Sequence, residues 1–232
     1  MAKKKKLRVT MSRRETGLGW VWLVFQFLAL PALLGLVNSL FPIPLSAGAL
    51  NFIYYCINCA FVLFACHGFL GRSLASAGRN FWEFLQAVVL GFVAYWVSTS
   101  ALSMLLGWIM PGFVNINDQS IASLAGSHYV LMVIGTVILV PTAEEVLFRG
   151  LIFGSIQRSS RVWAYVLCVT IFALVHVAGY ISSFGWIHLL LCFIQYIPAG
   201  LCLAWSYEKA DSILAPILIH TAINAIGIYA MR

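Results

Sequence analysis

Three formally charged residues, Glu144, Glu145 and Arg149, stand within six positions of a stretch that is otherwise apolar from residue 130 to 156. An ionisable side chain at the depth of a bilayer costs about 2.5 to 3.5 kcal/mol, so such residues are expected to be paired or to take part in a reaction. On a helix Glu145 and Arg149 face each other and can pair, whereas Glu144 points about 100° away. Glu144 therefore suits a general base that takes a proton from water.

Two further motifs lie in later apolar segments. Phe172 and His176 are four residues apart, and so are His220 and Asn224, which places each pair on one face of a helix. We expect these pairs to meet Glu144 in one intramembrane site. A carboxylate, two imidazoles and an amide can activate a water molecule and stabilise a tetrahedral intermediate. This set predicts hydrolysis of a peptide bond without a covalent enzyme intermediate.

Each motif also has a purely structural interpretation. The Glu145–Arg149 pair could only pack helices together, His176 could be a packing residue, and Asn224 could only hydrogen-bond between helices. A metal is a further alternative, because Glu144, His176 and His220 resemble a zinc ligand set. The sequence contains no His-Glu-x-x-His stretch, and it does not decide between a divalent metal such as zinc and no cofactor.

The composition indicates where this chemistry takes place. Of the 232 residues 62% are hydrophobic and only 9% are charged, whereas soluble domains carry about 25% charged residues. The chain is therefore expected to be an all-α, polytopic membrane helix bundle. Its net charge of +7 favours contact with membrane lipids and gives no reason to expect nucleic acid.

The hydropathy pattern predicts about seven transmembrane helices, at 19–40, 49–70, 81–110, 128–156, 162–180, 186–207 and 212–230. Pro31 is expected to kink the first of them, and Pro141 to open the fourth to water. Residues 111–127 are interpreted as a polar loop. Basic residues alternate between loops in the positive-inside pattern, which places the N-terminus in the cytoplasm.

These spans divide the chain into three parts. Residues 1–16 are expected to form a basic cytoplasmic tail, residues 17–127 a group of N-terminal transmembrane helices, and residues 128–232 a catalytic helical core.

The three motifs resemble those of the CPBP family, the Abi-type group of CAAX proteases and bacteriocin-processing intramembrane endopeptidases. The family's Glu-Glu-x-x-x-Arg, Phe-x-x-x-His and His-x-x-x-Asn motifs match, in this order, Glu144, Glu145 and Arg149, then Phe172 and His176, then His220 and Asn224. The resemblance covers the region from about residue 128 to the C-terminus.

The resemblance implies a membrane glutamic endopeptidase of a kind long labelled a metalloprotease. Glu144 would activate water together with His176, and His220 and Asn224 would bind the oxyanion. The supporting residues would be Glu145, Arg149 and Phe172.

The resemblance also bears on substrate and location. Eukaryotic relatives remove a tripeptide after a prenylated cysteine, and prokaryotic relatives process other peptides, so the expected substrate is a hydrophobic or lipidated peptide at the plasma membrane. Some relatives are thought to act without proteolysis, which leaves a membrane scaffold or an immunity or regulatory protein as the main alternative. A small transporter or proton relay is a second one. The sequence leaves the substrate, the cleavage position and the oligomeric state open.

Overall fold

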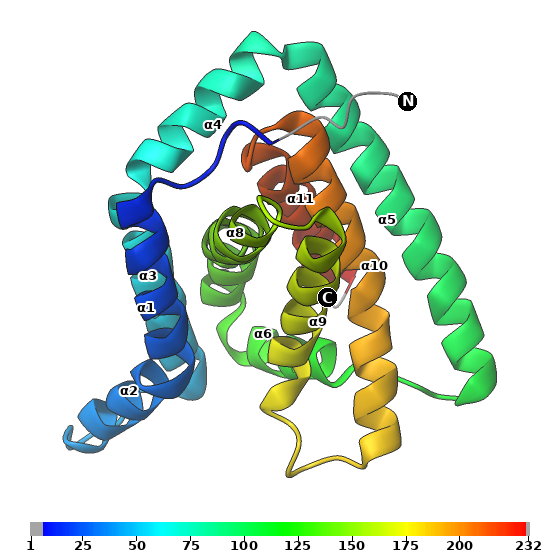
Figure 1. Ribbon diagram of the computed structural model, residues 1–232. Helices are drawn as coiled ribbons and strands as arrows, with labels where there is room; N and C mark the ends of the chain where they lie inside the picture. Colours follow the sequence, from blue (N-terminus) through cyan, green and yellow to red (C-terminus); the bar gives the residue numbers. More distant parts are fainter. Residues whose placement is uncertain (1–6, 231–232) are drawn as a thin grey trace.

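The computed structural model describes residues 7–230, and within them the chain is helical and contains no strand (Figure 1). The elements are α1 (Arg13–Leu28), α2 (Leu30–Ser39), α3 (Ala47–Ala65), α4 (His67–Arg79), α5 (Phe81–Ile109), α6 (Ile116–Ile134), η1 (Gly135–Leu139), α7 (Val140–Glu145), η2 (Val146–Phe153), α8 (Gly154–Ile156), α9 (Arg161–Ala178), α10 (Trp186–Ala210) and α11 (Leu214–Ala230), where η marks a π-helical stretch. Lys3 to Lys6 of the expected basic tail lie outside the described residues.

Several of these elements, alone or as continuous runs, are long and apolar enough to cross a membrane. Within the described residues five runs meet this condition, namely α3, α5, the continuous run 116–156 from α6 to α8, α9 and α10. The bent pair of α1 and α2 makes a sixth if the two are one span. The C-terminal helix α11 has 17 residues, about 25 Å, which is shorter than a hydrocarbon core of about 30 Å. The polytopic all-α bundle is confirmed, while seven spans and a cytoplasmic N-terminus remain predictions.

The expected kink in the first span is present. Helices α1 and α2 meet at Ala29 with a bend of 48°. Pro31 lies in the first turn of α2, where its missing N–H removes no helical hydrogen bond. The chain therefore bends where proline can be accommodated.

The expected loop at 111–127 is wrong, because α6 already begins at Ile116. The Asn115 side chain caps this helix by accepting a hydrogen bond from Asn117 N at 3.0 Å. Asp118 lies in the first turn, where a carboxylate interacts favourably with the helix dipole. The polar residues that suggested a loop thus form a helix start. The backbone leaves helical geometry only at His128 (φ −139°, ψ 48°), the residue at which the span was expected to begin.

Two π-helical stretches flank the short helix that carries Glu144 and Glu145. Pro141 lies in the first turn of α7, and its ring would clash with the carbonyl of residue 137 in a regular helix. The preceding stretch η1 avoids this clash with a wider turn, in which Val140 N–H donates to Gly135 O. The backbone around the two carboxylates therefore departs from the regular spacing of 3.6 residues per turn.

The run from η1 to α8 lies at the centre of the bundle (Figure 1). Helices α3 and α11 pack against η1 and α7, and α1, α9 and α10 pack against η2. All eight residues of η2 are buried. The motif helix is thus enclosed by elements from both halves of the chain.

The residues before α1 form an extended segment, 7–12, which we call the N-terminal strap. Its Arg8 and Val9 N–H groups donate to Asp211 Oδ1 at 2.8 and 2.9 Å, and Tyr207 Oη donates to Val9 O at 2.7 Å. Leu7, Val9 and Met11 are buried in the main core. The strap therefore ties the start of the chain to the turn between α10 and α11.

Candidate active site

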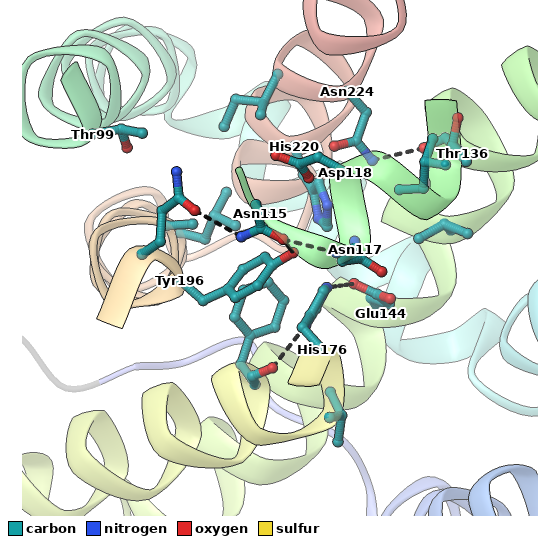
Figure 2. A pocket seen from close by; sticks show the side chains of 18 of the residues that line it. Thr99, Asn115, Asn117, Asp118, Thr136, Glu144, His176, Tyr196, His220 and Asn224 are labelled. Atoms are coloured by element: carbon teal, nitrogen blue, oxygen red, sulfur yellow. Dashed lines mark hydrogen bonds and ion pairs between the residues drawn. The ribbon is translucent and has the colours of Figure 1, made fainter. Parts of the chain in front are cut away.

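The three sequence motifs meet at one cavity. This cavity has a volume of about 320 Å³, and Glu144, His176, His220 and Asn224 all line it (Figure 2). The side chains come from α7, α9 and α11, which are separated in sequence by up to 80 residues. The structure thus brings together the four residues that the motifs singled out.

Glu144 and His176 face each other across the cavity. Glu144 Oε2 lies 3.9 Å from His176 Nε2, which is too long for a direct hydrogen bond. No hydrogen bond from a described residue reaches Glu144 Oε2. A separation of this size between two polar atoms is one that a bridging water molecule can fill. The geometry therefore offers a position for a water molecule between a carboxylate and an imidazole.

The backbone fixes the orientation of His176. Its Nδ1 lies 2.7 Å from Phe172 O, and since a carbonyl can only accept, Nδ1 carries the proton. In the neutral ring Nε2 is then an acceptor directed toward Glu144. The i to i+4 spacing of the Phe-x-x-x-His motif thus sets the tautomer of the histidine as well as its face of the helix.

An aromatic side chain that the motifs do not contain also holds His176. The imidazole lies between Phe172, at 4.5 Å between ring centroids, and Tyr196, at 4.4 Å. Tyr196 Oη donates to Asn115 Oδ1 at 3.3 Å. In the sequence, Tyr196 could have been noticed through its neighbour Gln195, a polar residue in the middle of the apolar α10.

Glu145 has a larger role than the expected ion pair. The pair with Arg149 is present at 2.9 Å, with both side chains fully buried. The same oxygen, Glu145 Oε1, also accepts a hydrogen bond from His220 Nδ1 at 2.7 Å. Glu145 therefore fixes the orientation of His220, and Nε2 is the ring nitrogen left for the cavity.

The Arg149 guanidinium completes this buried group. Its Cζ lies 4.3 Å from the centroid of the Phe172 ring, a cation–π contact, and its Nη2 donates to Gly200 O at 3.4 Å. Phe172 thus supports both His176 and Arg149. This double contact explains why an aromatic residue suits the first position of its motif.

Asn224 is held by a backbone group of η1. Its Nδ2 donates to Thr136 O at 2.8 Å across the helix interface. An amide nitrogen has two N–H donors, so one remains after this bond. Since Asn224 lines the cavity, its second N–H can serve a developing oxyanion.

The metal alternative does not fit these residues. Among residues 7–230, no three His, Cys, Asp or Glu side chains come close enough to hold a metal ion. The set of Glu144, His176 and His220 therefore does not form a ligand cluster in this structure.

Comparison with known proteins supports the resemblance found in the motifs. The model of the family described as "Type II CAAX prenyl endopeptidase Rce1-like" matches residues 126–226. The resemblance to the CAAX-protease family is confirmed over this segment. Residues 126–226 contain all seven motif residues, from Glu144 to Asn224. The residues before 126, including Asn115 and Asp118 of the cavity, lie outside it.

One curated relative aligns with a share of the chain similar to the share that the family model matches. The "UPF0177 protein YxdF" of Lactococcus lactis subsp. lactis (strain IL1403) is 32% identical over 95 residues, which are 41% of this chain and 47% of the relative. The aligned part thus spans about half the length of the curated relative. No solved structure matches the chain.

Proposed function

We propose that the chain is an intramembrane endopeptidase that hydrolyses peptide bonds with a water molecule activated by Glu144. The observation that carries this proposal is the pair of Glu144 Oε2 and His176 Nε2, 3.9 Å apart in a cavity that Asn224 also lines. The match of residues 126–226 to a protease family supports the same reaction class.

The reaction would begin with a water molecule between the two side chains. The water donates one hydrogen bond to Glu144 and the other to Nε2 of neutral His176. Glu144 then takes the first proton while the water oxygen forms a bond to the carbonyl carbon of the substrate. Because Phe172 O holds the Nδ1 proton, His176 positions the water and Glu144 acts as the base.

The carbonyl oxygen of the substrate becomes an oxyanion in this step. The second N–H of Asn224 would donate to it, and His220 would add a donor at Nε2 in its doubly protonated form, because Nδ1–H is bound to Glu145. The intermediate then collapses as the carbon–nitrogen bond breaks. Glu144 returns its proton to the leaving nitrogen, which balances the reaction and regenerates the carboxylate.

The proposed substrate is a hydrophobic or lipidated peptide that reaches the cavity from the membrane, and the proposed location is the plasma membrane. Five or six candidate spans support a multi-pass protein. A prenylated CAAX peptide is one member of this class.

The test is cleavage of a peptide panel by the protein purified in lipid nanodiscs. The panel contains farnesylated CAAX peptides and unmodified hydrophobic peptides. Glu144→Gln should abolish cleavage, because the amide cannot take a proton, and His176→Ala should lower kcat by about 10² to 10⁴. Glu83→Gln, the same change at an exposed glutamate of α5, is the matched control and should cleave normally.

Two outcomes would contradict the proposal. One is cleavage by Glu144→Gln at the wild-type rate. The other is no cleavage of any peptide together with full complementation of a deletion strain by Glu144→Gln, which would instead favour a scaffold or immunity protein. A parallel arm with a chelator tests the metal alternative, and since the expected ligands do not cluster, activity should persist.

A further inference from the structure

The cavity has polar lining residues that the proposed chemistry does not use. They come from α5, the start of α6 and α10, and they are Thr99, Asn115, Asn117, Asp118 and Gln195. Figure 2 shows Asn115, Asn117 and Asp118 bordering the same space as Glu144 and His176. A cavity built only for an apolar substrate has no need of these groups, so they point to recognition of something polar.

Asp118 is the charged member of this group. Its carboxylate lines the cavity, and no hydrogen bond or ion pair to it is found among residues 7–230. Among residues 7–230, the cavity lining contains two carboxylates, Asp118 and Glu144, and neither lysine nor arginine. Asp118 is an exposed residue that lines the cavity, so a ligand that enters the cavity can reach its carboxylate. The lining therefore favours a ligand that brings a positive charge.

A capping role does not account for this arrangement. An acidic residue in the first turn of a helix gains about 0.3–1 kcal/mol from the helix dipole, which explains why aspartate is tolerated at position 118. However, Asn115 already caps α6 through Asn117 N. The orientation of the Asp118 side chain toward the cavity is a separate observation.

The position of Asp118 is fixed relative to the candidate catalytic residues. Asn115 Nδ2 donates to Gln195 Oε1 at 2.8 Å, and Tyr196 Oη donates to Asn115 Oδ1. The Tyr196 ring in turn packs against the His176 ring at an interplanar angle of 32°. A short series of direct contacts thus connects the first turn of α6 to the imidazole. A substrate group bound at Asp118 would be held at a defined distance from the scissile bond.

Asp118 also lies outside residues 126–226, the segment that matches the family. The reacting groups and this carboxylate therefore come from different parts of the chain. This division suits a reaction that is shared with the family and a substrate selectivity that belongs to this chain.

We propose that Asp118 is a specificity-determining residue that selects peptides with a lysine or arginine side chain close to the scissile bond. This inference rests on the proposed function, because it names the substrate class of the same cavity. The substrate would then combine an apolar, membrane-inserted part with a single basic side chain in the cavity.

The test compares peptides that differ at one position. Each fluorescent peptide carries lysine, norleucine or glutamate, and the variable position is moved along the sequence. Binding is measured by fluorescence anisotropy to protein in nanodiscs that carries Glu144→Gln, so that no peptide is consumed. When the variable residue occupies the position that reaches Asp118, the lysine peptide should bind about 10- to 100-fold more tightly than the norleucine peptide. This is the range expected for a hydrogen bond to a charged group.

Variants of Asp118 then identify the residue responsible. Asp118→Asn keeps the shape of the side chain, and it should bring the ratio of lysine to norleucine affinities close to one. Asp118→Lys should reverse the preference toward the glutamate peptide. Glu83→Gln is the matched control for the loss of one carboxylate outside the cavity and should retain the wild-type ratio.

The outcomes separate this inference from the proposed function. The inference is overturned if protein that keeps Asp118 binds the lysine and norleucine peptides equally at every position, or binds neither of them. This result does not depend on whether the Asp118 variants fold. Cleavage by the wild type without any preference for lysine also overturns it and leaves the function intact. Binding that depends on Asp118, without cleavage of any peptide, overturns the function alone.

Discussion

Replacing Arg149 by methionine tests the buried charge network most directly. Glu145 and Arg149 are both 0% exposed, so Arg149→Met leaves a carboxylate in the core with His220 as its remaining partner. Removing one member of a buried ion pair costs about 3–5 kcal/mol. The lost cation–π contact with Phe172 adds about 0.5–2 kcal/mol, and the contact that Glu145 keeps with His220 offsets part of the total.

We therefore expect the free energy of unfolding to fall by about 3 kcal/mol, which is roughly a 150-fold change in the ratio of folded to unfolded protein. The assay is reversible unfolding by SDS in mixed micelles, followed by the fluorescence of the eight tryptophans. Arg79→Met, the same change at an exposed arginine at the end of α4, is the control and should alter stability by less than about 0.5 kcal/mol.

A second variant distinguishes charge from packing. Adding Glu145→Gln to Arg149→Met removes the unpaired carboxylate, so the double variant should recover at least half of the lost stability, since a buried pair can be replaced at little cost. The reasoning would be refuted if Arg149→Met unfolded like Arg79→Met. A double variant less stable than the single one would show that the loss comes from packing alone.

Two further predictions concern the groups around the cavity. Asn224→Ala should lower kcat by about 10² to 10³, the usual effect of removing an oxyanion donor, while KM for the same peptide changes little; an unchanged kcat would remove Asn224 from the reaction. Tyr196→Phe keeps the ring that packs against His176 and loses the bond to Asn115, so its kcat should stay above that of Tyr196→Ala. Tyr196→Ala loses the aromatic support, worth about 0.5–1.5 kcal/mol and thus up to about tenfold in rate. Equal kcat values for the two Tyr196 variants would show that the contact between this ring and His176 does not affect the rate.

The sequence was sufficient to predict the contacts that lie within one helix. The Glu145–Arg149 pair and the shared face of Phe172 and His176 follow from the i to i+4 spacing, and both are present. The expected meeting of the three motifs also agrees with the cavity, because the cost of burying ionisable groups in a membrane brings such groups together. The all-α membrane bundle followed from composition alone.

The contacts between helices could not be predicted in the same way. His220 with Glu145 and Asn224 with Thr136 join residues that are 75 and 88 positions apart, and their pairing depends on how each helix is rotated about its axis. The π-helical stretches on both sides of α7 change that rotation, because each wider turn adds a residue that a period of 3.6 does not include. Tyr196 was missed because aromatic residues are common in membrane spans and its neighbours on α6 are distant in sequence.

The N-terminal strap has a consequence for how the protein is made. Arg8 lies 203 residues before its hydrogen-bond acceptor Asp211. At about 5–20 residues per second, translation of the intervening chain takes roughly 10–40 s. Throughout that time the strap has no access to the groups that later hold it. The strap therefore reaches its final contacts only after α10 has been made, and a copy whose synthesis stops before the turn after α10 leaves Leu7, Val9 and Met11 without their place in the core.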